Sequence, residues 1–154
     1  TPKIRELIDD MFDTMYEARG VGLAAPQVGI LRRICVIDVM DGDPIILINP
    51  EITKYEGEIL EDFEGCLSIK DIYGKVPRYS RVRVKALDIH GKEFRFTAEG
   101  FLARVVQHEI DHTNGMVFID HIKESSEAFY KLDEEGQLEP LNYEADIKAD
   151  SLLW

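Results

Sequence analysis

The chain is organised around one stretch, Gln107-His108-Glu109-Ile110-Asp111-His112. Two histidines stand four residues apart, and a glutamate directly follows the first. In a helix, positions i and i+4 lie on one face a turn apart, so His108 and His112 can bind one metal ion. Glu109 then projects beside the ion, where it can act as general base toward a bound water. The alternative is a structural helix whose two imidazoles are buried only for packing.

The helix that carries this stretch is expected to begin at Thr97 and to end at Asn114. Thr97 is a suitable N-cap residue, Glu99 favours the positive end of the helix dipole, and Gly115 favours a helix end. Its buried surface is expected to consist of four apolar residues, Phe101, Leu102, Val105 and Val106.

Hydrophobic periodicity predicts further elements on both sides of this helix. The pattern favours an amphipathic helix over 2–19 capped at Gly20, a hairpin of strands 34–39 and 45–48, an exposed strand over 52–63, a second hairpin built from 82–87 and 94–96, and a short helix over 127–132. The predicted fold class is therefore α+β, with antiparallel β-sheets packed around a central metal-binding helix that carries the HExxH motif.

Composition narrows the function classes. The chain has 154 residues, 45% hydrophobic and 31% charged, as in a soluble globular domain. It shows no apolar run long enough for a membrane span and no secretory signal. The net charge of −12 argues against a DNA or RNA partner. Two cysteines, Cys35 and Cys66, together with the histidine pair, indicate a reducing compartment.

A catalytic metal needs a third protein ligand, because such sites use three and leave one position for water. The spacing of metzincin proteases fails, because Phe118 stands at their last histidine position and His121 comes three residues later. A downstream glutamate, Glu124 or Glu127, would act as in thermolysin-like proteases. Cys66 is the strongest candidate, because a thiolate suits a borderline-soft divalent ion; its alternative is a small buried apolar residue, as expected for Cys35.

Three segments together resemble the signature motifs of the peptide deformylases. They are Gly-Val-Gly-Leu-Ala-Ala-Pro-Gln at 20–27, Glu-Gly-Cys-Leu-Ser at 64–68 and Gln-His-Glu-Ile-Asp-His at 107–112. Their order and spacing agree as well, and the resemblance spans residues 4–121. On its own, the glycine-rich 20–27 segment is explained equally well by a helix cap and turn or by close approach of a ligand.

The resemblance implies hydrolysis of the N-formyl group from the formyl-methionine of newly made polypeptides, with release of formate. It implies Cys66, His108 and His112 as metal ligands and Glu109 as general acid and base. The Gln27 side-chain amide and the Leu67 backbone N–H would stabilise the oxyanion. The implied cofactor is one divalent ion, Fe(II) in the cell, with Zn, Ni or Co as substitutes.

The resemblance also implies how a formyl-methionyl peptide binds. The extended peptide would add as a strand beside the backbone near Val21, Gly22 and Gly65. The methionine side chain would enter an apolar pocket near Val21, Phe101, Val105 and His108. Glu64, Asp111 and Arg78 are expected to orient a ligand loop or the helix, since metal-binding histidines are normally held by a second set of groups.

The expected organisation is a catalytic domain over 1–122, apparently without the family's N-terminal strand region, followed by an acidic extension over 123–154. From Lys123 onward the chain has three basic and nine acidic residues, a net charge of −6. Transient proximity to the ribosome is expected, but the acidic extension argues against direct RNA binding. The expected location is the bacterial cytoplasm, and an organelle reached with a removed leader is the alternative.

Two other functions compete with deformylation. One is a zinc metalloprotease with a glutamate as third ligand, which replacement of Cys66 would leave nearly unaffected. The other is a catalytically inactive binding protein that keeps the fold for a partner, against which the intact Gln27, Glu109 and both histidines argue.

Overall fold

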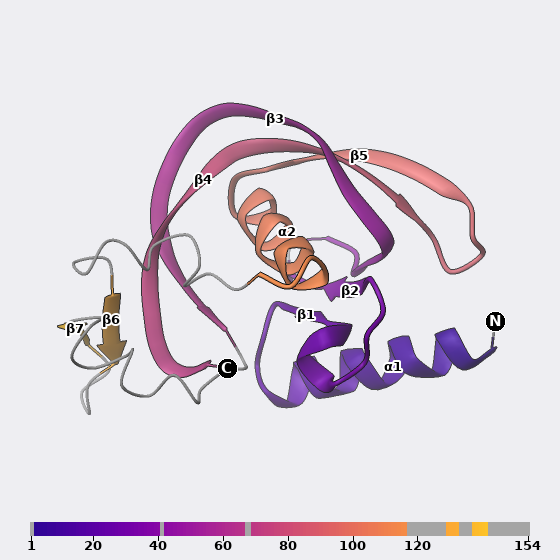
Figure 1. The fold of residues 1–154 in the computed structure, drawn as a ribbon, viewed down its shortest axis with the longest axis horizontal. Helices are drawn as coiled ribbons and strands as arrows, with labels where there is room; N and C mark the ends of the chain where they lie inside the picture. Colours follow the sequence, from indigo (N-terminus) through magenta and orange to yellow (C-terminus); the bar gives the residue numbers. More distant parts are fainter. Residues whose placement is uncertain (1, 41, 67–68, 117–128, 133–136, 142–154) are drawn as a thin grey trace. The chain divides into compact units, whose positions relative to one another are not determined.

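The computed structural model describes residues 2–40, 42–66, 69–116, 129–132 and 137–141. Figure 1 shows the order of their elements. They are α1 (Pro2–Glu17), β1 (Gly22–Ala24), the 3-10 helix η1 (Ala25–Val28), β2 (Ile34–Ile37), β3 (Ile45–Cys66), β4 (Ile69–Leu87), β5 (Glu93–Glu99), α2 (Gly100–Thr113), β6 (Phe129–Leu132) and β7 (Leu138–Leu141).

The described strands form one sheet in the order β1-β2-β3-β4-β6-β7, and β5 also pairs with β4. The registers of β1–β2, β2–β3, β4–β5, β4–β6 and β6–β7 are all antiparallel, so the class is α+β as predicted. The chain divides into two compact units, the first formed by residues 1–58 and 79–116, and the second by 59–78 and 117–154. Strands β3 and β4 run through both units, whereas both helices belong to the first.

In the first unit, β1 and β2 lie between the two helices (Figure 1). Successive side chains of a strand point to opposite faces of the sheet. Accordingly, Ile34 and Val36 pack with α1 in one apolar cluster, while Cys35 and Ile37 pack with α2 in another. All four are at most 2% exposed. The β1–β2 strand pair therefore separates two apolar cores, one on the α1 side and one on the α2 side.

The start of α2 differs from the prediction. Thr97 lies in β5, the N-cap residue is Glu99, and the helix begins at Gly100. Strand pairing with β4 keeps β5 extended as far as Glu99, which lies opposite Arg81 in the register. Gly100 then turns the chain with a φ of 61°. Tertiary pairing has overridden a local capping preference here. The predicted end is confirmed, because Asn114 is the C-cap and Gly115 has a φ of 79°.

Other boundaries also differ. Residues 45–66 form one continuous strand, not two strands with an interruption, and bends at Asn49 and Gly57 (φ 49° and 77°) accommodate its length. Residues 129–132, predicted to be helical, form β6, because they pair with both β4 and β7. The left-handed residue after α1 is Arg19, with a φ of 58°, and not Gly20.

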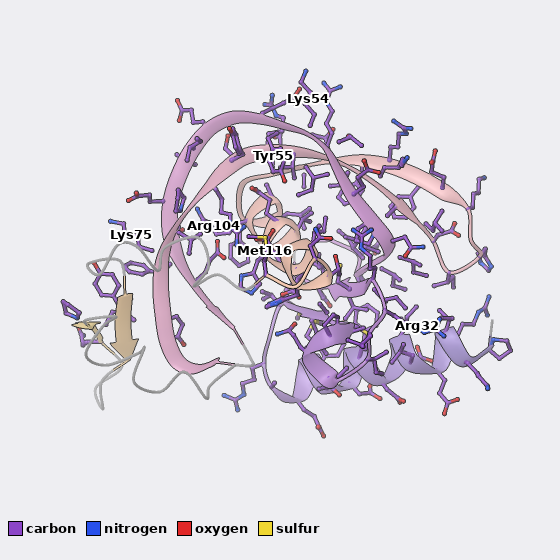
Figure 2. The ribbon with its side chains drawn as sticks, in the orientation of Figure 1. Arg32, Lys54, Tyr55, Lys75, Arg104 and Met116 are labelled. Carbon is purple, nitrogen blue, oxygen red and sulfur yellow. The ribbon has the colours of Figure 1, made fainter. Side chains whose placement is uncertain are left out.

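The face of β3 and β4 away from α2 carries interleaved charges. Lys54 extends from β3 on this side (Figure 2) and pairs with Glu56 at 3.1 Å, and Arg83 of β4 approaches the same carboxylate at 3.3 Å. Strands β3 and β4 are also linked by an aromatic contact between Tyr55 and Tyr79, whose ring centroids are 5.2 Å apart. Along residues 81–86 of β4, exposed or half-buried side chains thus alternate with buried ones, with Val82, Val84 and Ala86 in the core that contains α2.

Helix α1 is tied to Asp38, the residue that follows β2, by one short hydrogen bond. The Tyr16 hydroxyl donates to Asp38 Oδ2 at 2.5 Å, and the Met40 N–H donates to Asp38 Oδ1 at 2.9 Å. Both bonds lower the pKa of Asp38 below its ordinary value, and the bond from Tyr16 has the larger effect. A carboxyl group whose pKa is lowered by folding stabilises the folded state at pH values above its unfolded pKa of about 4. This stabilisation is lost as the pH falls through the folded pKa.

We therefore expect Tyr16→Phe to lower the free energy of unfolding at pH 6 and to have a smaller effect at pH 3. Urea unfolding of the metal-free protein at both pH values measures the difference. Tyr79→Phe is the control, because it removes a hydroxyl from a surface tyrosine of β4. A Tyr16→Phe effect of equal size at both pH values would contradict the role of the ionised Asp38.

Among the described residues, neither helix has the length and apolar character that crossing a membrane requires.

Candidate metal centre

Helix α2 presents three potential ligands at one point. His108 Nε2 and His112 Nε2 lie 3.1 Å apart, and Glu109 Oε1 lies 3.9 Å from His108 Nε2. The three residues are 8%, 5% and 4% exposed, respectively. The imidazole rings are nearly perpendicular, with an interplanar angle of 80°. A buried face of α2 therefore brings two nitrogens and a carboxylate together, as the i and i+4 spacing predicts.

This donor set fits a divalent ion. Two nitrogens each about 2.1 Å from one ion, at an angle between 90° and tetrahedral, stand about 3.0–3.4 Å apart. The observed 3.1 Å falls in that range. It also suits a hydrogen bond between a protonated and an unprotonated Nε2, so distance alone does not require an ion. Imidazole nitrogens suit zinc, iron, nickel and copper, whereas magnesium and calcium prefer oxygen ligands.

Gln27 is held in a fixed orientation beside α2. It lies in η1, which contacts α2, and its Oε1 accepts the Ala24 N–H at 2.8 Å. This is the return bond of a capping box, in which a side chain at the third helical position reaches back to the N-cap amide. Because the oxygen is used in this bond, the side chain's donor, Nε2, is the group that points elsewhere.

Cys66 is the last residue of β3 in the second unit, and its side chain lies outside the described part of the structure. Leu67 lies outside it entirely. The preceding residue is described: a Cβ placed on Gly65 would lie 2.8 Å from Cε1 of Tyr73. The Tyr73 ring therefore covers Gly65 directly, and a larger residue at 65 would displace either the ring or the strand.

Two residues before Cys66, Glu64 forms a buried bidentate ion pair with Arg78 of β4. Arg78 Nε and Nη2 donate to the two carboxylate oxygens, each at 2.9 Å, and both side chains are 5% exposed. Fork-like pairs of this kind fix geometry as well as charge. This contact supports the sequence-based hypothesis that Glu64 acts through Arg78.

We expect Arg78→Met to lower the free energy of unfolding by about 3–5 kcal/mol, because it removes the guanidinium that pairs with the buried Glu64 carboxylate. The matched control is Arg81→Met on the same strand, whose 2.7 Å pair with Glu99 is solvent-exposed. That change should cost about 1 kcal/mol or less. Urea unfolding compares the two variants, and equal small losses would show that the buried pair does not hold β3 to β4.

The residues predicted to bind substrate have different environments. Gly22 lies against Glu109, at a distance too short for any side chain at position 22. Val21 is 36% exposed, and Phe101, predicted to belong to the buried surface of the helix, is instead 58% exposed. Val105 does belong to the α2 core and is 6% exposed. Phe101, Val105 and His108 are spaced along one face of α2, so an apolar side chain next to the histidine would meet both.

Sequence reasoning missed the role of Gln107. Its Nε2 donates to the carbonyl oxygens of Tyr79 at 2.8 Å and Ala103 at 3.0 Å, and the side chain is buried. Gln107 thus anchors the helix to β4 just before the first histidine. A polar residue within the apolar stretch that precedes His108 is the signal that could have revealed it.

Comparison with known proteins agrees with this geometry. The family model described as polypeptide deformylase matches residues 1–128. The peptide deformylase of Caldicellulosiruptor bescii is 55% identical over 120 residues, which cover 78% of this chain and 71% of that protein. That of Halothermothrix orenii is 57% identical over 123 residues, 79% of each chain.

Solved structures show the same relationship. The peptide deformylase from Synechococcus elongatus in complex with actinonin has a TM-score of 0.75 and 45% identity, covering 77% of this chain and 67% of that one. The Thermotoga maritima peptide deformylase has a TM-score of 0.76 and 44% identity, covering 79% and 82%. The resemblance seen in the three motifs is thus confirmed, and the chain belongs to the polypeptide deformylase family, hydrolases that remove the N-formyl group from newly made polypeptides.

Proposed function

We propose that Cys66, His108 and His112 hold one divalent metal ion, and that deformylation of formyl-methionyl peptides takes place beside it. The observation that carries this proposal is the convergence of the two histidine nitrogens with Glu109 on a buried face of α2. Among the described residues, the group that could bind a metal ion consists of His108, His112 and Glu109. A thiolate from Cys66 would complete the three protein ligands and leave Glu109 for catalysis.

The bound ion would lower the pKa of a water ligand so that a nucleophile is available at neutral pH. Glu109 accepts the proton of the attacking water and passes it to the nitrogen of the methionine as the formyl C–N bond breaks. One water is consumed, and formate and a free amino terminus are released.

The Gln27 amide and the Leu67 N–H supply hydrogen bonds to the oxygen of the formyl group as it gains negative charge. For Gln27, the support is its fixed Oε1, which directs the Nε2 donor to a single side. The Leu67 role rests on the motif resemblance alone.

We expect Gln27→Glu to lower kcat by about 10²-fold or more. The glutamate can still accept the Ala24 N–H, but it cannot donate from its other oxygen and adds a negative charge opposite the oxyanion. Formate release and unfolding are measured together. A variant of unchanged stability and unchanged kcat would contradict the oxyanion role.

For the substrate, we propose that the methionine side chain occupies an apolar site formed by Val21, Phe101 and Val105 near His108. The peptide backbone would pair with the chain near Val21, Gly22 and Gly65. The exposed Phe101 side chain, on the same helical face as His108, supports this placement.

For the metal, Fe(II) is proposed in the cell, with zinc, nickel or cobalt as substitutes.

The catalytic part is proposed to be 1–122, and the acidic extension 123–154 is proposed not to bind RNA, because its net charge is −6. Contact with ribosomes would then be transient. The bacterial relatives support a cytoplasmic location.

The proposal is tested by anaerobic purification, metal analysis and a formate-release assay on formyl-Met-Ala-Ser. About one equivalent of metal and formate release that ceases on chelation are expected. Acetyl-Met-Ala-Ser is the matched substrate control and should be a poor substrate. A metal-loaded protein that leaves the formyl peptide intact would refute the proposal.

A further inference from the structure

Gly22 of β1 lies in direct contact with the side chain of Glu109. A Cβ placed on Gly22 would lie 2.8 Å from Cγ, 2.9 Å from Cδ and 2.9 Å from Oε1 of Glu109. Real Cβ atoms essentially never approach another heavy atom so closely. Any side chain at position 22 would therefore force Glu109 or the strand to move.

The backbone does not explain why this residue is glycine. Six other glycines adopt a left-handed φ in the described part of the chain, but Gly22 does not. It is a regular strand residue, paired with Ile37 of β2. Other residues can adopt that conformation, so the absence of a side chain, rather than backbone freedom, is the property the structure uses here.

Two nearby residues on the same face, Ala24 and Cys35, are also small, although Ile37 directly opposite Gly22 is large. Ala24 pairs with Cys35, and directly opposed residues of an antiparallel pair point to the same face. Both are fully buried on the α2 side, in a cluster that otherwise contains mainly Val, Leu and Ile. Burial raises the pKa of the Cys35 thiol, and the nearby negative charge of Glu109 raises it further. Glu109 thus lies over a shallow part of the face formed by Gly22, Ala24 and Cys35.

We propose that Gly22 is a positioning residue that fixes the Glu109 carboxylate beside His108, in addition to any contact its backbone makes with substrate. The proposal rests on the proposed function of Glu109. Because the carboxylate is buried against β1, a methyl group at position 22 must displace it. The three heavy atoms nearest to that Cβ all belong to Glu109 and none to a histidine, so the metal site should remain.

The main test is Gly22→Ala in the metal-loaded enzyme. We expect kcat to fall by about 10²-fold, since displacement of a catalytic group by about 1 Å has this effect. The KM should change by no more than about threefold and the metal content should not change. A crystal structure should show Glu109 Oε1 displaced from its 3.9 Å separation from His108 Nε2. Unchanged kcat, or a loss confined to KM, would overturn the proposal.

A double-mutant comparison separates this contact from general damage to the strand. Any loss in the midpoint of thermal unfolding caused by Gly22→Ala, or outright failure to fold, should disappear in a Glu109→Ala background, which removes the obstructing atoms. Gly65→Ala is the matched control, because its 2.8 Å clash is with Tyr73; Tyr73→Ala should relieve it and Glu109→Ala should not. If Glu109→Ala fails to relieve Gly22→Ala, the proposal is wrong.

Failure of the proposed function gives a different result. If Glu109 is not the general base, Glu109→Gln will keep its rate, whatever the outcome at Gly22. If Glu109→Gln is inactive but Gly22→Ala has full kcat, only the positioning role is refuted.

Discussion

Glu109→Gln is expected to lower kcat for formate release by about 10³-fold or more while the metal content stays the same, because positioned general acid–base groups contribute about 10²–10⁴-fold. Glutamine has nearly the same shape, so it can fill the space against Gly22. It cannot accept and return a proton. The two histidines that face each other at 3.1 Å are untouched by the change.

Glu99→Gln is the matched control for this substitution, because Glu99 is a solvent-exposed residue at the start of α2. It should leave kcat unchanged. Steady-state kinetics and metal analysis on the same preparations decide the result. If Glu109→Gln keeps more than about a tenth of the wild-type kcat, Glu109 is not the general base.

Cys66→Ser is expected to remove most of the bound metal and to lower the rate by more than about 10²-fold, since loss of groups that only support a ligand already costs 10–100-fold. A serine hydroxyl stays protonated at neutral pH and is a poor ligand for a borderline-soft ion. Metal per chain is measured after anaerobic purification.

Cys35→Ser is the control, because Cys35 is a fully buried thiol in β2. It should keep its metal even if it loses stability. If Cys66→Ser retains metal and rate, the third ligand is another residue, and the zinc metalloprotease alternative with Glu124 or Glu127 becomes the better account.

The parts of the fold that follow local patterns were predicted from the sequence. The first helix, predicted over 2–19, is observed over 2–17, and the predicted hairpin of apolar strands is the β2–β3 pair. The helix that carries His108 and His112 was also predicted from its pattern. The convergence of the two histidines follows from helix geometry alone.

What was missed depends on contacts between distant segments. The start of α2 was misplaced because β5 pairs with β4 through Glu99, which overrides the capping preference of Thr97. The strand at 129–132 exists because β4 and β7 flank it, and its own composition favoured a helix. The contact between Gly22 and Glu109 leaves only a glycine as its trace in the sequence, and a glycine has several other common explanations.

The central claim is that Cys66 Sγ and the Nε2 atoms of His108 and His112 bind one ion. A crystal structure of the metal-loaded protein, with anomalous scattering at the metal edge, tests it most directly. The account predicts one peak about 2.3 Å from the sulfur and about 2.1 Å from each nitrogen, with a water as fourth ligand. A peak bound by the histidines but distant from the sulfur, or no peak at α2, would contradict it.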